Sequence, residues 1–430
     1  MGAEEASTPG AARRFVRAIR APFARLRRWW LSRGLDVAQF PELDLRSGTV
    51  ELSPVTFPPT DPSLGPGVNL YGYIHGQFGL GHTARMYARA LLSVGYPVAI
   101  NDAGLRIPHA CNDYSMAPYL GCGSPYPVNL VFVNPDLFGA LAPRLKRQGH
   151  GRTIAFWFWE LETIPDCWLP VLDQVDEVWV STRFVEDAFR KVTDKPITRV
   201  PHPVLPKREA DLPRSSFGLH DEAFVFLCSF DFNSSVHRKN PWAVIRAFKM
   251  AFGGAKGGVQ LLVKCSNGFR YPELLRRLME EAAGDSRILV RDQVLDEGQL
   301  HALQEAADAY VSLHRAEGLG LGMAEAMARG KPVIATSWSG NLDFMNEHNS
   351  CLVPYRMVPV GKGEYPFTDR GTWAEPDVLA AAEWMARLVH EPELARRIGA
   401  QARQDILDTM SLRAAADVMC ARLRALEPGK

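Results

Sequence analysis

The feature that most constrains the fold is an alternation of short apolar runs with amphipathic stretches, which occurs twice along the chain. The apolar runs are typical of buried strands, and strands that alternate with helices form a parallel sheet with right-handed crossovers. Each half therefore predicts one doubly wound, Rossmann-like α/β domain, and the two domains are expected to face each other across a cleft. The expected strands are 68–75, 97–101, 128–134, 153–160, 176–181, 223–230, 259–265, 287–292, 309–314 and 331–336.

The two repeats are separated by residues 200–213, which contain four Pro and four charged residues and are typical of a linker between domains. Amphipathic stretches predict the helices, and 373–377 is expected to be a loop that leads into a helix. The expected helices are 82–94, 241–252, 272–283, 297–307, 321–329, 377–390, 392–408 and 411–426. We divide the chain into four parts: a basic segment (1–35), an N-terminal domain (36–205), a C-terminal domain (206–408) and a last helix (409–430). The last helix can pack back on the N-terminal domain.

The composition excludes several classes of protein. The chain of 430 residues is 47% hydrophobic and 23% charged, which is typical of a compact globular protein. A net charge of +1 gives no reason to expect nucleic-acid binding. The seven cysteines include no Cys-x-x-Cys pair, so we expect reduced thiols in a cytosolic protein rather than a zinc site or a disulfide framework. No apolar run approaches the ~18–20 residues that cross a bilayer, and no secretory signal is visible.

The charge is concentrated at the N-terminus. Residues 1–35 contain eight Arg and two Glu, a local charge of +6, so the remaining residues carry −5. Within this segment, 13–33 has aromatic and aliphatic side chains at spacings of three or four with Arg between them. We expect a basic amphipathic helix that lies on an anionic membrane surface, although a helix packed on the protein's own surface would have the same pattern.

The strongest chemical feature is the glycine-rich stretch that follows the expected strand 309–314. Glycines at a strand-to-helix turn let backbone N–H groups approach an anion, and the helix N-terminus adds partial positive charge. Glu317 lies on this loop, and Glu325 lies about two turns further on. Two carboxylates beside a phosphate cradle suit hydroxyl groups, those of a sugar and of a ribose. The alternative is a glycine turn with two glutamates on the surface.

Basic residues precede the expected helix 241–252. Arg238 and Lys239 could stabilise the charge that develops on a leaving diphosphate, together with loop amides. No Asp-x-Asp occurs in the chain, so a metal-independent site without cofactor is expected. The alternative for this pair is a solvated loop.

Two further loops follow strands of the first domain. Gly79, Gly81 and His82 belong to a glycine loop after the first strand, where they could reach the cleft, although His82 could also be an ordinary polar residue at a helix start. Trp159 and Glu160 end the strand 153–160, where an aromatic ring and an acid suit sugar stacking and hydroxyl binding. Core packing is the alternative for the tryptophan.

Several segments of the sequence resemble a known family. Residues 317–325, EGLGLGMAE, with Ala326, Met327, Gly330, Pro332 and Val333 after them, resemble the E-x7-E motif of retaining glycosyltransferases of group 1, or family 4. The resemblance extends to 72–91, 158–165, 237–248 and 337–344, and it covers most of residues 68–410. It implies the GT-B fold.

The resemblance also implies roles for individual residues. Glu325 would hold the ribose hydroxyls of a nucleotide sugar, Glu317 the donor sugar, and Lys239 the diphosphate. The amides of four loop residues would face the sugar and the diphosphate: Gly318, Leu319, Gly320 and Leu321.

The chain departs from the family pattern in two places. The family's usual Arg, about six residues before the Lys, would fall near Asn233, whereas Arg238 is adjacent to the Lys. Asp343 stands where the family commonly has Glu.

We therefore expect a glycosyltransferase that moves a sugar from a nucleotide-diphosphate donor to a hydroxyl acceptor, with retention implied by the resemblance. A saccharide or lipid-linked acceptor in polysaccharide or glycolipid assembly would agree with a cytoplasmic, peripheral membrane location. Two alternatives stay open: a GT-B epimerase of nucleotide sugars and a non-catalytic GT-B subunit. A nicotinamide oxidoreductase is disfavoured because the G-x-G-x-x-G order is missing.

Overall fold

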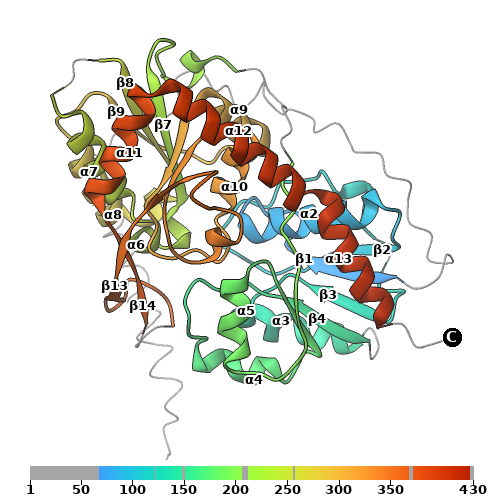
Figure 1. Ribbon diagram of the computed structural model, residues 1–430. Helices are drawn as coiled ribbons and strands as arrows, with labels where there is room; N and C mark the ends of the chain where they lie inside the picture. The colour runs from blue at the N-terminus through green and yellow to red at the C-terminus, as the bar shows by residue number, and fades with distance from the viewer. Residues whose placement is uncertain are drawn as a thin grey trace, which may run out of the picture.

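The computed structural model describes residues 67–121, 123–147, 151–205, 212–254, 257–367 and 371–426. The predicted amphipathic helix at 13–33 lies outside the described residues. Within the described part, two parallel six-stranded sheets with helices on their faces confirm the expected α/β architecture (Figure 1).

The N-terminal sheet has the strand order β2-β1-β3-β4-β5-β6, and all of its neighbouring strands are parallel. Its strands are β1 (Val68–Gly72), β2 (Val98–Asp102), β3 (Val128–Val131), β4 (Arg152–Phe156), β5 (Glu177–Val180) and β6 (Ile197–Arg199). The helices of this domain are α2 (Gly79–Ser93), α3 (Pro135–Arg147), α4 (Leu169–Leu172) and α5 (Arg183–Arg190). The buried strands β1, β3 and β5 have apolar residues on both faces, because helices cover both sides of the sheet.

The C-terminal sheet has the order β12-β11-β10-β7-β8-β9, again with parallel neighbours. Its strands are β7 (Phe224–Asp231), β8 (Val259–Ser266), β9 (Ile288–Asp292), β10 (Ala309–Ser312), β11 (Val333–Thr336) and β12 (Cys351–Val353). Its helices are α6 (Val236–Lys239), α7 (Pro241–Phe252), α8 (Pro272–Ala282), α9 (Glu297–Ala306), α10 (Leu321–Ala328), α11 (Val378–His390) and α12 (Pro392–Thr409). Parallel strands present all their carboxyl ends at one edge, so the loops that follow them meet there.

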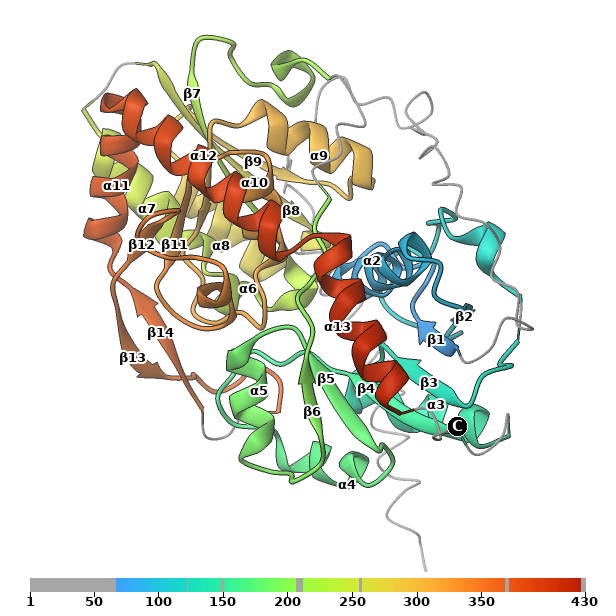
Figure 2. The same ribbon diagram turned by 45° about the vertical axis from the view of Figure 1, so that its right-hand side comes forward.

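The end of the chain crosses from one domain to the other (Figures 1 and 2). Helix α12 packs on α10 of the C-terminal domain, and the next helix, α13 (Leu412–Ala425), packs on α2 of the N-terminal domain. Apolar side chains of α13, including Met419 and Leu423, belong to the N-terminal core. Arg422 of α13 also pairs with the buried Glu177 of β5 at 2.7 Å. The last helix is therefore part of the N-terminal domain in space.

A second contact between the domains comes from an antiparallel hairpin that belongs to neither large sheet. Strands β13 (Tyr355–Pro359) and β14 (Thr372–Pro376) form it, and Figure 2 shows it extending below the C-terminal sheet. Trp373 of β14 is buried among the core residues of the N-terminal domain. The expectation of a loop at 373–377 was wrong, because these residues pair with β13 and only Asp377 caps the following helix.

Other expected boundaries were inexact at the first loop. The first strand ends at Gly72 rather than at residue 75, because the chain turns there and the Gly76 N–H donates to the Tyr73 carbonyl at 2.8 Å. The helix begins at Gly79 rather than His82. Gly81 is required in its first turn, since a Cβ atom there would lie 2.3 Å from the Gly76 carbonyl oxygen.

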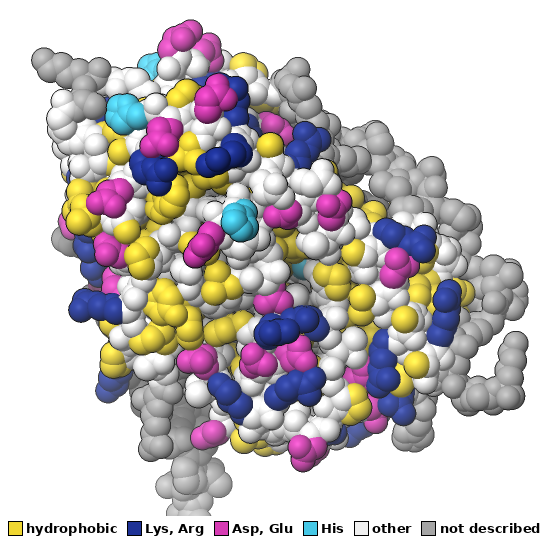
Figure 3. Space-filling view, viewed as in Figure 1, with side chains coloured by type: hydrophobic (Ala, Val, Ile, Leu, Met, Phe, Trp, Pro, Cys, Tyr) yellow, Lys and Arg dark blue, Asp and Glu magenta, His cyan; other side chains and the backbone are white. Residues whose placement is uncertain are grey.

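Basic and acidic side chains of the described residues are interspersed on the face shown in Figure 3. Among those residues, no helix combines the length and the apolar character needed to span a membrane.

Candidate active site

A cavity of about 310 Å³ lies between the carboxyl ends of the two sheets. The N-terminal domain contributes the loop between β1 and α2 and the first turn of α2, with Gly79 and His82 of that turn in the wall. The C-terminal domain contributes the ends of β7, β8 and β10 and the start of α10, with Lys239, Glu317 and Glu325 in the wall. Side chains from distant parts of the chain are therefore brought to one space at the edge where doubly wound folds bind their ligands.

The short helix α6 positions the basic pair. Ser235 and Asn240, which flank α6, have positive φ angles of 65° and 50°. Such angles are uncommon outside glycine and are retained where the surrounding structure over-determines them. Ser235 is held on both sides, because its Oγ donates to the Glu364 carbonyl at 2.7 Å and caps the N–H of Arg238. This strained turn directs Arg238 and Lys239 towards the loop that contains Glu317.

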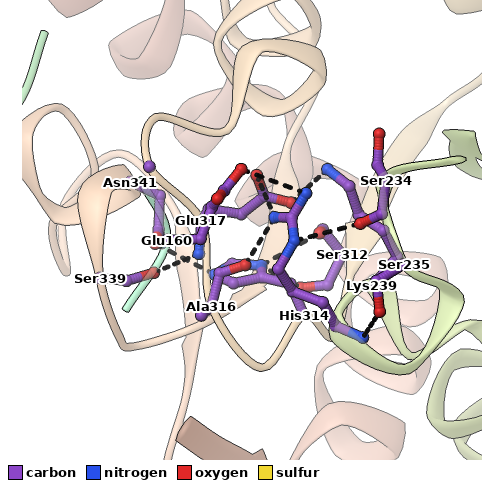
Figure 4. A network of polar contacts seen from close by, with 12 residues as sticks. Glu160, Ser234, Ser235, Lys239, Ser312, His314, Ala316, Glu317, Ser339 and Asn341 are labelled. Carbon is purple, nitrogen blue, oxygen red and sulfur yellow. Dashed lines mark hydrogen bonds and ion pairs between the residues drawn. The ribbon is translucent and has the colours of Figure 1, made fainter. Parts of the chain in front are cut away.

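Glu317 is the centre of a buried ion cluster (Figure 4). One carboxylate oxygen is 3.0 Å from Arg238 Nη1, and the other accepts a hydrogen bond from Lys239 Nζ. Burial alone would raise the pKa of this carboxyl, but the charges of Arg238 and Lys239 lower the pKa to about 2. Glu317 is only 6% exposed and is ionised at neutral pH.

A second carboxylate completes this cluster from the N-terminal domain. Glu160 Oε1 lies 3.6 Å from Arg238 Nη2, and Glu160 Oε2 accepts a hydrogen bond from Tyr365, which follows β13. Arg238 is 4% exposed and also donates to the Ala316 carbonyl at 2.8 Å. Two cations therefore face two carboxylates, and the cluster of Arg238, Lys239, Glu160 and Glu317 has no net charge.

The loop after β10 is fixed by the residues that follow β11. The Glu317 N–H donates to Ser339 Oγ at 2.8 Å, and the Gly340 N–H donates to the Glu317 carbonyl at 2.8 Å. Gly340 must be glycine, because a Cβ atom would lie 2.2 Å from the Gly318 carbonyl oxygen. Gly320 precedes α10 with φ of 93°, and it lines the cavity together with Leu321 and Gly322 of the first turn of this helix.

Glu325 lies at the other end of the cavity wall. Its Oε2 accepts a hydrogen bond from Gln304 Nε2 at 2.9 Å, and its Oε1 is 3.9 Å from His82 Nε2. Burial raises the pKa of the Glu325 carboxyl, an effect that the charge of Arg329 and the hydrogen bond from Gln304 oppose. Burial and the charge of Arg85 lower the pKa of His82, so this imidazole is neutral at pH 7. The Glu325 carboxylate can therefore accept further hydrogen bonds from a ligand in this part of the cavity.

The structure does not bring every predicted residue to the cavity. Arg238, Trp159 and Glu160 do not line the cavity. Trp159 is instead part of the core, because its indole donates to the Thr163 carbonyl and packs on Trp168. The predicted residues outside the wall are Arg238, Gly318, Leu319, Gly81, Trp159 and Glu160, and those in it are Gly79, His82, Lys239, Glu317, Gly320, Leu321 and Glu325.

Gly318 instead joins the domains. Its carbonyl accepts a hydrogen bond from Thr182 Oγ1 at 2.7 Å, and a Cβ atom would lie 2.8 Å from the Trp159 carbonyl oxygen. Asp343 acts nearby in a similar way, because its carboxylate accepts from the Arg183 N–H at the start of α5.

The cavity wall also contains polar residues that the sequence did not identify, and Arg85, Gln304 and Lys264 are among them. Arg85 is buried in α2, pairs with Asp113 at 3.0 Å and donates to two carbonyls of the β1–α2 loop. Gln304 orients Glu325 from α9. Lys264 lies near the end of β8, where a lysine in the apolar run VQLLVKC was an available signal. The sequence pattern of an amphipathic helix does not show that residues such as Arg85 and Gln304 line a cavity, because their burial depends on contacts with other elements.

Comparison with a family model agrees with this geometry. Residues 225–359 match the model described as glycosyl transferases group 1. The matched segment runs from β7 to β13 and contains Lys239, Glu317 and Glu325. No curated protein matches the chain.

Several solved structures have the same fold. Sucrose-phosphate synthase from Thermosynechococcus elongatus has a TM-score of 0.61 at 19% identity, over 84% of this chain and 99% of that chain. A glycosyltransferase from Rickettsia africae has a TM-score of 0.61 at 14% identity, over 85% and 100%. HepE from Anabaena, solved with UDP and glucose, has a TM-score of 0.58 at 12% identity, over 84% and 100%. The expected GT-B fold is confirmed.

Proposed function

We propose that the protein is a glycosyltransferase that moves a sugar from a nucleotide-diphosphate sugar to a hydroxyl group, with retention of anomeric configuration. The observation that supports this most directly is that one cavity is lined by Glu325, by Lys239 with its partner Glu317, and by the first residues of α10. The match of residues 225–359 to glycosyl transferases group 1 gives independent support.

In this proposal each end of the cavity performs one part of the reaction. Glu325 accepts hydrogen bonds from ribose hydroxyls, as a carboxylate can from a vicinal diol. Lys239 and the amides at the start of α10 stabilise the negative charge that grows on the diphosphate as the sugar leaves. Glu317 holds Lys239 in place and lies beside the reacting sugar. Arg238 does not line the cavity, and its role is to pair with Glu317 and keep that carboxyl ionised.

The test is a panel of UDP-, GDP- and ADP-sugars with the full-length protein, in which release of the nucleoside diphosphate is measured with and without saccharide acceptors. We expect turnover with one donor, and Lys239→Ala should lower kcat by about 10²–10³-fold, the effect of losing one electrostatic contact in a transition state. The matched control is Lys146→Ala on the exposed face of α3. An isomerised nucleotide sugar without acceptor would indicate an epimerase instead, and a failure of every donor to bind or react would contradict the proposal.

We also propose that the transfer needs no divalent metal, because Lys239 and the α10 amides are placed where a metal would otherwise neutralise the diphosphate. The absence of an Asp-x-Asp sequence agrees with this. Turnover in excess chelator should equal turnover with added magnesium, and a large loss that magnesium restores would contradict it. NMR of the product anomer tests retention.

The acceptor and location belong to the same proposal. The +6 charge of residues 1–35 suits attachment to the anionic cytoplasmic leaflet, where a lipid-linked or growing saccharide would be the acceptor. The enzyme would then act in polysaccharide or glycolipid assembly at the membrane surface.

A further inference from the structure

Lys264 is a buried lysine that faces the cavity. It lies near the carboxyl end of β8, opposite Ser229 of the central strand β7, and is 7% exposed. The alternation of side chains along β8 places it on the same face as Leu262, which packs in the core beneath α9 and α10. Lys264 and the adjacent Ser266 both belong to the cavity wall.

The ammonium group of Lys264 has no partner within the described residues. No hydrogen bond or ion pair reaches it there, and the neighbouring carboxylates bind other groups: Asp231, which also lines the cavity, contacts His109 and Asn267, and Asp292 accepts from the Gly268 N–H. Burial lowers the pKa of Lys264, and the charges of these two carboxylates oppose that effect. A largely buried ammonium that opens only onto a cavity has lost part of its hydration without gaining a partner, and a bound anion would supply one.

The other cations of the cavity are already paired. Lys239 binds Glu317, and Arg85 binds Asp113. Among the lysines and arginines that line this cavity in the described part of the chain, Lys264 alone has no carboxylate within 4 Å. Because Glu160 and Glu317 neutralise Arg238 and Lys239, the cluster around α6 cannot by itself balance the charge of a diphosphate.

We propose that Lys264 binds the diphosphate of the nucleotide-sugar donor as a second cation beside Lys239. This inference rests on the proposed function of the same cavity. A nucleotide sugar brings two negative charges, and one of them would form a charge-assisted hydrogen bond with the unpaired ammonium, which is stronger than one between neutral groups. The unpaired lysine would thus be a source of affinity for phosphate groups.

The test measures binding of UDP, GDP and ADP, and of the matching nucleosides, to the full-length protein by calorimetry. Lys264→Met keeps the length of the side chain and removes its charge. We expect it to weaken binding of the preferred nucleoside diphosphate by roughly 10–100-fold, as for a lost hydrogen bond between charged groups, and to leave binding of the nucleoside unchanged. Lys146→Met on the exposed face of α3 is the matched control and should bind as wild type.

Thermal melting separates this role from a structural one. Without ligand, Lys264→Met should melt at or above the wild-type temperature, because an unpaired buried charge has been removed. Equal loss of nucleoside and diphosphate binding together with a lower melting temperature would overturn the inference.

Reductive methylation of the wild-type protein provides a test that does not depend on folding of a variant. The nucleoside diphosphate should protect Lys264 and the nucleoside should not. If the wild type binds no nucleoside diphosphate at all, the proposed function fails. If it binds one that Lys264→Met binds equally well, the inference fails and the proposed function stands.

Discussion

At the scale of single residues, Glu317 links stability to pH. Its pKa is lowered from 4.5 to about 2, so its ion pairs stabilise the folded state fully above about pH 4.5, and this contribution is lost as the pH falls from about 4.5 to about 2. We expect Glu317→Gln to lower the free energy of unfolding by about 3–5 kcal/mol at pH 7, since it leaves Arg238 and Lys239 short of a partner. The difference from wild type should shrink between pH 4.5 and pH 3 in urea titrations.

The matched control for this experiment is Glu393→Gln, which breaks an exposed pair with Arg396. Exposed pairs contribute little, so this variant should stay within about 0.5 kcal/mol of wild type at each pH. A Glu317→Gln difference of the same size at pH 7 and pH 3 would contradict the assignment of the lowered pKa.

Glu325 should behave differently from Lys239 in kinetics. In the proposed function it holds the ribose in the ground state and in the transition state alike, and uniform binding appears in KM rather than kcat. Glu325→Gln should therefore raise the donor KM by roughly 10–100-fold, as for a lost hydrogen bond to a charged group, with a smaller fall in kcat. Glu383→Gln on the exposed face of α11 should change neither constant. A fall in kcat with unchanged KM would assign Glu325 to the chemical step.

At the scale of elements, the β13–β14 hairpin is the part of the C-terminal domain that supports the ion cluster. Tyr365, in the loop of this hairpin, donates to Glu160, which in turn faces Arg238. Tyr365→Phe should lower the free energy of unfolding by about 1.5–3 kcal/mol, because it removes a hydrogen bond to a partly buried charged group. Tyr355→Phe in the same hairpin keeps its ring contact with Trp338 and should change stability by less than about 0.5 kcal/mol. Equal effects of the two variants in urea unfolding would contradict this role.

The same hairpin shows where prediction from the sequence ends. The buried parallel strands are continuous apolar runs, so the pattern identified β7, β8 and β10 almost to the residue. Strand β13 is mostly exposed and has no such pattern. Arg238 could equally have been a solvated residue by sequence, because its partner Glu160 comes from the other domain. Local patterns predict elements and their loops, whereas pairing across the cleft requires the tertiary structure.

At the scale of the whole molecule, the charge asymmetry predicts membrane attachment through residues 13–33. The full-length protein should float with vesicles that contain phosphatidylglycerol, and a chain that begins at Asp36 should not, because each basic residue near an anionic surface contributes about 1 kcal/mol. Vesicles of phosphatidylcholine alone should bind neither. Equal flotation of both chains with the anionic vesicles would exclude this segment as the anchor.

The contribution of α13 to the N-terminal domain has a consequence for synthesis on the ribosome. Residues 67–205 are made before the C-terminal domain, but α2 packs both on strands of its own domain and on α13, whose Met419 and Leu423 lie near the end of the chain. Trp373 completes the other side of the same domain and is also made late. Domains usually fold in the order in which they emerge. Here the first of the two domains to emerge reaches its final packing last, after the second has been translated.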